Sequence, residues 1–324
     1  MTEPTALLLL PHIQVQSANA ISGPLTWGFP SPTAFVGFVH ALERRFSDKL
    51  QDGFGGVGIV CHSFEPQISQ PHGRRTRVFH LTRNPVGKDD KSASFVEEGR
   101  THMEISLVIA VHDFMSQKNG EYFTEDVMQI VQGMRLAGGS ILPIRVGKRF
   151  DAQWWPLAED IEGQNEQFQK LRRRLLPGFA LVQRNDLLSE QLDEMRQKNP
   201  QANSLDALMD ISRLNIEPDL SNPEKPGGVI WSVRKKAGWF VPIPIGYAAL
   251  SPLYDPGEVV NTRDNITPFR FVESLYSLGE WVSPHRMTQL QQLLWYLKTD
   301  PETGIYCCIN HYSNDFTHKS ETSE

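Results

Sequence analysis

The stretch TALLLLPHIQVQ, residues 5–16, decides the start of the fold. It is apolar from Ala6 to Leu10 and alternates between polar and apolar residues from Pro11 onward. This pattern is typical of a strand that is buried at its start and half-covered later. The run is too short to span a membrane, and no Lys or Arg precedes it as in a secretory signal. We therefore predict the first strand of a globular protein.

The segments after this strand predict the order β-α-β-β-α-β. Residues 29–46 favour a helix, because Ser31 is a natural N-cap and Pro32 stands at the first helical position. Two further strands, a second helix with Thr124 as its cap, and a glycine turn with a short strand follow at residues 58–69, 101–113, 124–136 and 137–147. This order is the ferredoxin-like plan, which RNA-recognition domains also use. We predict an α+β fold with a ferredoxin-like core.

The composition is that of an ordinary globular chain. With 324 residues, 40% of them hydrophobic and 22% charged, the sequence is long enough for one elaborated domain or two ordinary ones. Three cysteines, two of them adjacent at Cys307 and Cys308, form neither a disulfide framework nor a zinc pattern. We expect a cytoplasmic protein that needs no metal or other cofactor.

The chain divides into two predicted parts at about residue 150. Residues 1–150 hold the ferredoxin-like domain, in which segment 71–100 extends the hairpin between the second and third strands. Residues 151–324 predict a helix-rich C-terminal elaboration that also contains strands. In it, 283–298 has the spacing of a helix behind a Ser-Pro start, and 216–228 is a Pro- and Gly-rich loop.

Basic residues are concentrated in the sequence although its formal net charge is -6. Residues 66–88, 127–150 and 167–185 contain no Asp or Glu, and each window carries four or five Lys or Arg. Such a basic set on an acidic background is typical of a localised polyanion site. Alternatively, these cations are dispersed in space and paired with surface carboxylates. The arginines at 172–174 spread by about 100° each around a helix, so they cannot all serve one ligand.

The first basic window contains PHGRRTRVFHLTRNP, residues 71–85. In an extended strand, alternation would place one set of side chains on a common face, namely Arg75, Arg77, Phe79, Leu81 and Arg83. Arginines beside an aromatic ring suit single-stranded nucleic acid, because guanidinium groups bind phosphates and rings stack on bases. Alternatively, Phe79 and Leu81 are core residues of a hairpin.

A second candidate site is GMRLAGGSILPIRVGKR, residues 133–149. Gly138 and Gly139 would let a phosphate approach the backbone amides, while Arg135 and Arg145 supply positive charge. The segment lacks the motif of a nucleotide triphosphate loop. A tight turn between helix and strand explains the same glycines.

Catalytic motifs are scarce. The sequence has no G-x-S-x-G and no H-E-x-x-H, and the H-x-E that begins at His102 lacks the cysteine pair of zinc deaminases. His80 and His102 could act as general acid or base in RNA cleavage. A structural or RNA-contacting role explains them more simply, so we expect no enzyme.

Several long phrases together resemble a known family. They include GRRTRVFHLTRNP, GMRLAGGSILP, GWFVPIPIGYAALSPLY and TPFRFVESLYSLGEWVSPHR. From about Ala6 to Leu297 such phrases are similar to the second Csy subunit of type I-F CRISPR surveillance complexes. Segments 150–167 and 198–228 depart most from the family phrases, together with the cysteine-containing tail.

This resemblance implies a repeat-associated RNA-binding (RAMP) fold in which 71–100 is a projecting thumb. It also implies binding of the 5′ handle of CRISPR RNA (crRNA), pairing with the large Csy subunit, contact with the repeated backbone subunit, and target DNA reached through the assembled complex. In this family a separate protein cuts the precursor RNA. The RNA-facing candidates are Arg74, Arg75, Arg77, Phe79, Arg83, Arg100, Arg135, Gly138, Gly139 and Arg145. A RAMP-type endoribonuclease and a pure protein-interaction subunit are the alternatives.

Overall fold

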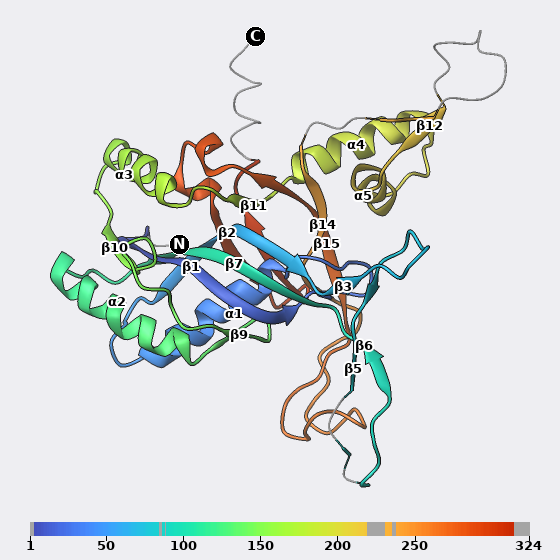
Figure 1. The fold of residues 1–324 in the computed structure, drawn as a ribbon, viewed down its shortest axis with the longest axis horizontal. Coiled ribbons are helices and arrows are strands. Elements are labelled where there is room, and N and C mark those ends of the chain that lie inside the picture. The colour runs from blue at the N-terminus through green and yellow to red at the C-terminus, as the bar shows by residue number, and fades with distance from the viewer. Residues whose placement is uncertain (1–2, 84–85, 88, 219–230, 235–237, 314–324) are drawn as a thin grey trace.

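The computed structural model describes residues 3–83, 86–87, 89–218, 231–234 and 238–313. In these residues the chain is a mixed α/β protein with five α-helices and a large antiparallel sheet of eleven strands (Figure 1). No helix in this part of the chain is long and apolar enough to cross a membrane.

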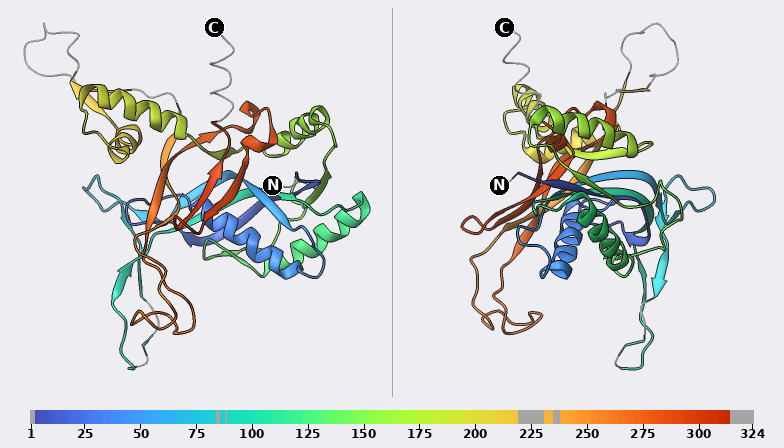
Figure 2. Two further views of the ribbon diagram at one scale, coloured as in Figure 1. Left: turned by 180° about the vertical axis from the view of Figure 1, so that it is seen from behind. Right: turned by 90° about the vertical axis from the view of Figure 1, so that its left-hand side faces the viewer.

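Four strands at one side of the large sheet lie in the order β2, β7, β1 and β9, and each neighbouring pair is antiparallel. Their bounds are Phe54–Pro66, Arg100–Val111, Ala6–Asn19 and Gly139–Ile141. Helix α1 (Pro32–Glu43) connects β1 to β2, and α2 (Gln117–Gln132) lies between β7 and the hairpin of β8 (Arg135–Leu136) and β9. Both helices cover the same face of the four strands (Figure 2).

The long apolar run of β1 reflects burial on both faces. Leu8 and Leu10 pack in the core beneath α1 and α2, whereas Leu7 and Leu9 pack in a second core on the opposite face. A β-bulge then shifts the pairing between Leu10 and Ile13, so odd-numbered residues take over the helix-facing positions. The shift explains why the alternation of the sequence changes at Pro11.

The C-terminal strands continue the same sheet. Strands β11, β14, β15, β16 and β17 span Phe179–Gln183, Phe240–Ala249, Val272–Val282, Leu294–Asp300 and Ile305–Asn310. Strand β2 pairs with β16 at Val57 and Gly58 and with β11 at Val60 and Cys61. The pairs β16–β17, β17–β14, β14–β15 and β15–β11 then complete a closed ring of antiparallel strands. A further strand, β10 (Gln153–Pro156), pairs with β1.

Three helices belong to the C-terminal half. Helix α3 (Ile161–Arg174) covers the second core through Phe168 and Leu171. Helices α4 (Asn185–Lys198) and α5 (Ser204–Ser212) pack against each other. With the paired strands β12 (Ile216–Pro218) and β13 (Trp231–Val233), they form an arm that extends away from the sheet (Figure 1).

Segment 71–100 projects from the body in another direction (Figure 1). Two short antiparallel pairs form at its base and within it, rather than one long ladder. Strand β3 (Ile68–Ser69) pairs with β4 (Val78–Phe79), and β5 (Leu81–Arg83) pairs with β6 (Phe95–Glu97).

Three sequence predictions of local structure are wrong. Helix α2 begins at Gln117 with Ser116 as N-cap, and Thr124 is instead a buried helix residue whose hydroxyl donates to the Gly120 carbonyl. Residues 71–77 are not a strand, so the common face predicted for the arginines does not form. The segment 283–298 contains two short 3-10 helices, η2 (Pro284–Arg286) and η3 (Leu290–Gln292), followed by β16.

The apolar side chains of segment 283–298 explain the third error. Met287, Leu290 and Leu293 are buried, as their spacing predicted. Leu294 and Trp295 nevertheless pair with the edge of β2 that β7 does not occupy. This non-local pairing overrides the local helical preference. Most of the predicted loop 216–228 lies outside the described residues.

Closure of the ring predicts that Gly246→Ala destabilises the fold. A Cβ atom at Gly246 would lie 2.6 Å from the Cys307 Cα atom across the β14–β17 pair, so the two strands would have to separate. We expect a loss of about 1–3 kcal/mol in the free energy of unfolding, measured by chemical denaturation. Gly37→Ala is the matched control, because Gly37 is exposed on α1 with open space around it. The control should be neutral or stabilising by up to about 1 kcal/mol, and equal destabilisation by both changes would contradict the proposed cause.

Candidate nucleic-acid interface

The two predicted basic sites meet at the end of β1. Asn19 pairs with Arg100, the first residue of β7. The backbone N–H of Asn19 donates to the Ala137 carbonyl at 2.8 Å. The next residue, Ala20, donates to the Gly99 carbonyl at 2.8 Å. The glycine turn and the base of segment 71–100 therefore flank the same few residues of β1, although they are far apart in the sequence.

The glycine turn is a two-residue β-hairpin connection between β8 and β9. Ala137 and Gly138 have φ angles of 48° and 75°, as a turn of this type requires. Gly139 is buried, and a Cβ atom there would lie 2.7 Å from the Ala18 nitrogen. Gly139 is thus explained by close packing on β1, whereas Gly138 is exposed and available to a ligand.

Three arginines near this turn already have partners. Arg135 donates to the Gly138 carbonyl at 3.3 Å, and Arg100 forms an ion pair with Glu98 at 2.7 Å. Arg145 lies 2.5 Å from Glu104 and stacks on the ring of Phe150 at 4.2 Å. A phosphate that approaches Arg100 or Arg145 would have to share the guanidinium with a carboxylate.

The arginines of segment 71–83 are different. Arg74, Arg75 and Arg77 are exposed, and none of them forms an ion pair with any residue that the structure describes. Arg83 stacks over the Phe95 ring at 4.0 Å, which leaves the donors at the edge of its guanidinium free for phosphate. No described carboxylate neutralises any of these four arginines, which belong to the set predicted to bind RNA.

Phe79 and Leu81 of this segment differ in their burial. Phe79 is half-buried and packs edge-on against Trp27, with ring centroids 5.3 Å apart. Leu81 is 64% exposed, so the alternative that it belongs to the core is wrong. Phe79 thus anchors the segment to the body while Leu81 faces solvent.

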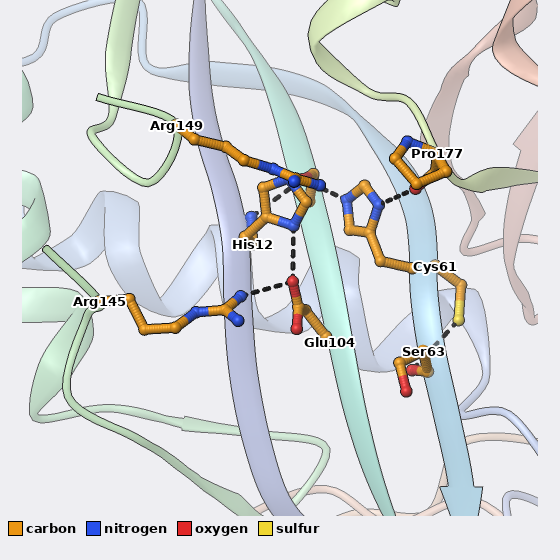
Figure 3. Close-up of polar contacts among 9 residues, drawn as sticks. His12, Cys61, Ser63, Glu104, Arg145, Arg149 and Pro177 are labelled. Atoms are coloured by element: carbon orange, nitrogen blue, oxygen red, sulfur yellow. Dashed lines mark hydrogen bonds and ion pairs between the residues drawn. The ribbon is translucent and has the colours of Figure 1, made fainter. Parts of the chain in front are cut away.

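Sequence reasoning missed a polar cluster on the face of β1, β7 and β2 that lies opposite α1 and α2 (Figure 3). His12, at the β-bulge of β1 with φ 51°, stacks on His62 with a centroid separation of 4.1 Å. The His12 Nδ1 atom lies 2.6 Å from a Glu104 oxygen, and Arg149 Nε donates to His12 Nε2 at 3.0 Å. The Pro-His pair inside an apolar strand was the available sequence signal.

The partners assign the protons of both imidazoles. His12 Nε2 accepts from Arg149, so its Nδ1 must carry the proton that Glu104 accepts. His62 Nδ1 faces the Pro177 carbonyl at 2.6 Å and must donate to it, which leaves Nε2 to accept from the Ser106 hydroxyl at 2.7 Å. Ser106 in turn accepts from the His12 backbone N–H. Both rings are neutral in this arrangement.

Burial lowers the pKa of His12 and of His62, and it outweighs the hydrogen bonds to Glu104 and Pro177 that raise them. Burial raises the pKa of the Glu104 carboxyl. The hydrogen bonds from Arg145 and His12 lower it, and the net effect is a lowered pKa. The cluster therefore holds an ionised Glu104 beside two neutral imidazoles. Its chemical effect is to fix Arg145 and Arg149 of the 143–150 loop against the sheet.

The two histidines weighed as cleavage residues are placed differently. His102 Nδ1 accepts from the Ser17 backbone N–H at 3.0 Å and supports a second irregularity of β1. His80 is exposed between β4 and β5. The contacts of His102 favour a structural role, and no contact of its side chain with other described residues assigns a role to His80.

Comparisons with known proteins show the family of the chain. A family model described as "CRISPR-associated protein (Cas_Csy2)" matches residues 8–308, so the chain belongs to that family of CRISPR-associated proteins. The chain is 54% identical over 316 residues to "CRISPR-associated protein Csy2" of Pseudomonas aeruginosa strain UCBPP-PA14, which covers 94% of this chain and 95% of that protein. The resemblance to the second Csy subunit of type I-F complexes is confirmed, and it implies a role in a type I-F CRISPR complex.

The stacked histidines predict a pH-dependent stability. Below the ordinary histidine pKa of 6.5 the unfolded chain binds protons that the folded His12 and His62 resist. The free energy of unfolding should therefore decrease as the pH falls through this range, before Glu104 protonates. Thermal unfolding at pH 7.5 and pH 5.5 measures the loss.

His62→Gln should reduce that loss, because glutamine can donate to Pro177 without titrating. His72→Gln, at an exposed position, is the control and should leave the pH dependence unchanged. The same pH dependence in the wild type and in His62→Gln would contradict the assignment.

Proposed function

We propose that this chain is a non-catalytic subunit that binds the 5′ handle of crRNA and assembles with the large and the backbone Csy subunits, through which the complex targets DNA. The exposed arginines at 74, 75 and 77, which precede the aromatic Phe79 in the chain, carry the proposal. Guanidinium groups without carboxylate partners keep their full capacity to bind phosphates. Membership of a CRISPR-associated family supports crRNA as the polyanion.

The topology supports the finer assignment of the fold. The strand order β9, β1, β7, β2 with helices after β1 and β7 is the order of a ferredoxin-like domain, as in RNA-binding RAMP proteins. On this interpretation residues 1–150 are that domain, segment 71–100 is its thumb, and residues 151–324 are the elaboration packed on it. The three free cysteines at 61, 307 and 308 suit the cytoplasm, where such a complex would work.

The charge distribution supports binding of RNA at one localised surface. The formal net charge of -6 means that the surface outside the basic windows is acidic. An acidic surface disfavours non-specific binding of nucleic acid, while the thumb and the glycine turn present the opposite charge. The binding of RNA would thus be confined to one region.

An endoribonuclease that uses His80 or His102 is the first rival. Incubation with unprocessed repeat RNA, followed by a denaturing gel, separates the two. Intact RNA is the expected result. Site-specific cuts that disappear in His80→Ala or His102→Ala would make the chain an enzyme.

A pure protein-interaction subunit is the second rival, in which partner carboxylates would meet the arginines. Fluorescence anisotropy with a repeat-derived 5′ handle and a scrambled strand, at two salt concentrations, distinguishes it. We expect tight binding that prefers the handle and weakens steeply with salt. Weak binding of both strands at low salt would favour the protein-interaction subunit.

Substitution of the thumb arginines tests the site itself. Arg75→Ala, Arg77→Ala and Arg83→Ala combined should weaken handle binding and reduce the slope of log affinity against log salt by up to about 2, since each phosphate contact on a single strand contributes roughly 0.7. Thermal stability should change little, because exposed substitutions usually cost less than about 0.5 kcal/mol each.

The matched control removes the same charge elsewhere. Lys170→Ala, Arg173→Ala and Arg174→Ala combined act at exposed positions on α3. This variant should bind the handle like the wild type. An equal loss of handle affinity in both variants would mean that only the overall charge of the protein matters. Unfolding of the thumb variant would mean that its arginines are structural.

A further inference from the structure

An aromatic cavity lies beside the thumb. Its volume is about 540 Å³, and the elements around it are the 20–29 loop, β2, β11, β14 and β15. Six aromatic side chains line it, namely Trp27, Phe29, Phe64, Phe179, Trp239 and Trp281. Cavities of this size bind small planar ligands or parts of larger ones.

The walls of the cavity are held in place before any ligand arrives. In the 20–29 loop, Gly28 N–H donates to the Ala20 carbonyl at 2.7 Å. The same loop is tied to β15, because Leu25 N–H donates to the Tyr276 hydroxyl at 3.2 Å. Trp281 belongs to β15 and packs near Trp239, with ring centroids 6.4 Å apart. A preformed site of this kind binds without a large ordering cost.

Three of the aromatic rings remain open to solvent. Trp27 is 55% exposed, Trp239 is 60% exposed and Phe179 is 46% exposed. Phe179 and Trp239 contact each other at a centroid separation of 6.0 Å but do not close the cavity. Large aromatic rings left uncovered together mark a binding surface, because their burial in the chain itself would have been favourable.

The polar groups of the cavity define the ligand further. Arg77 of the thumb contributes the positive charge to the lining. Among the described residues that line the cavity, none is acidic. The site thus combines aromatic ring faces with a cation.

We propose that this cavity receives an unstacked base of the bound RNA. Trp239 and its neighbours would stack on the base, and Arg77 would hold the adjoining phosphate. An apolar side chain from a partner protein would offer no anion to Arg77, so a base with its adjoining phosphate fits the lining better. The inference rests on the proposed binding of RNA and adds a base-reading site outside the thumb.

The test combines a protein variant with RNAs that each lack the base, but not the backbone, of one nucleotide. Handle RNAs in which one nucleotide at a time is abasic are bound to the chain, purified together with its Csy partners, and their affinities are measured. In the wild type, one position should lose roughly 5- to 150-fold in affinity when its base is removed, the range that stacking on an aromatic ring supplies. In Trp239→Ala that loss should shrink or vanish, while other positions respond as in the wild type.

One further variant keeps the test interpretable. Trp231→Ala removes a tryptophan of nearly equal exposure, 61%, on β13 outside the cavity, and should behave as the wild type.

The outcomes separate the two levels of the proposal. Handle binding that depends on salt and on the thumb arginines, but with the same abasic profile in wild type and Trp239→Ala, would overturn the base-binding cavity alone. The absence of handle binding in the wild type would overturn the proposed function as well. Loss of a Csy partner from Trp239→Ala, with the abasic profile unchanged, would assign the cavity to a protein side chain and overturn the inference.

Discussion

The hydrogen bonding of strand β2 along both of its edges is the constraint on which the rest of the structure depends. One edge pairs with β7 over most of its length, and the other is shared by β16 near Val57 and by β11 near Val60. Each unpaired backbone group of a buried strand would cost free energy, so β2 needs partners on both sides. The two halves of the sequence are thereby joined into one sheet, and the core beneath α1 and α2 includes Leu181 and Trp295 from the C-terminal half.

This shared strand also places the surfaces on which the functional argument rests. After its pairings with β11 and β16, β2 runs on to Pro66 and into the segment that carries the exposed arginines. Strand β7 returns from that segment and begins at Arg100, beside the end of β1 and the glycine turn. A rigid sheet thus fixes both basic sites at one end of the molecule. The same end carries the aromatic cavity, because β11, β14 and β15 reach it from the ring.

The cations of this end fall into two groups with different consequences. Arg100 and Arg145 are paired with carboxylates, and the stacked histidines and Arg149 hold the loop of Arg145 against the sheet. Their role is compatible with shaping the surface, since a ligand would have to compete with a charged partner. The arginines at 74, 75 and 77 have no such competitor among the described residues, and they are the natural first contact for a phosphate backbone.

Local chemistry was sufficient to predict part of this protein from its sequence. The Ser31-Pro32 start of α1, the buried strand β1 and the clustering of arginines between two strands depend on residues close together in the chain. Only the tertiary structure decided that Leu294 and Trp295 lie in a strand rather than a helix, because the open edge of β2 supplies their partners. The bulge that buries His12 beside His62, and the cavity built from Trp27, Trp239 and Trp281, likewise join residues that are far apart in the sequence. Such contacts depend on sheet pairing and closure, which no local pattern of residues specifies.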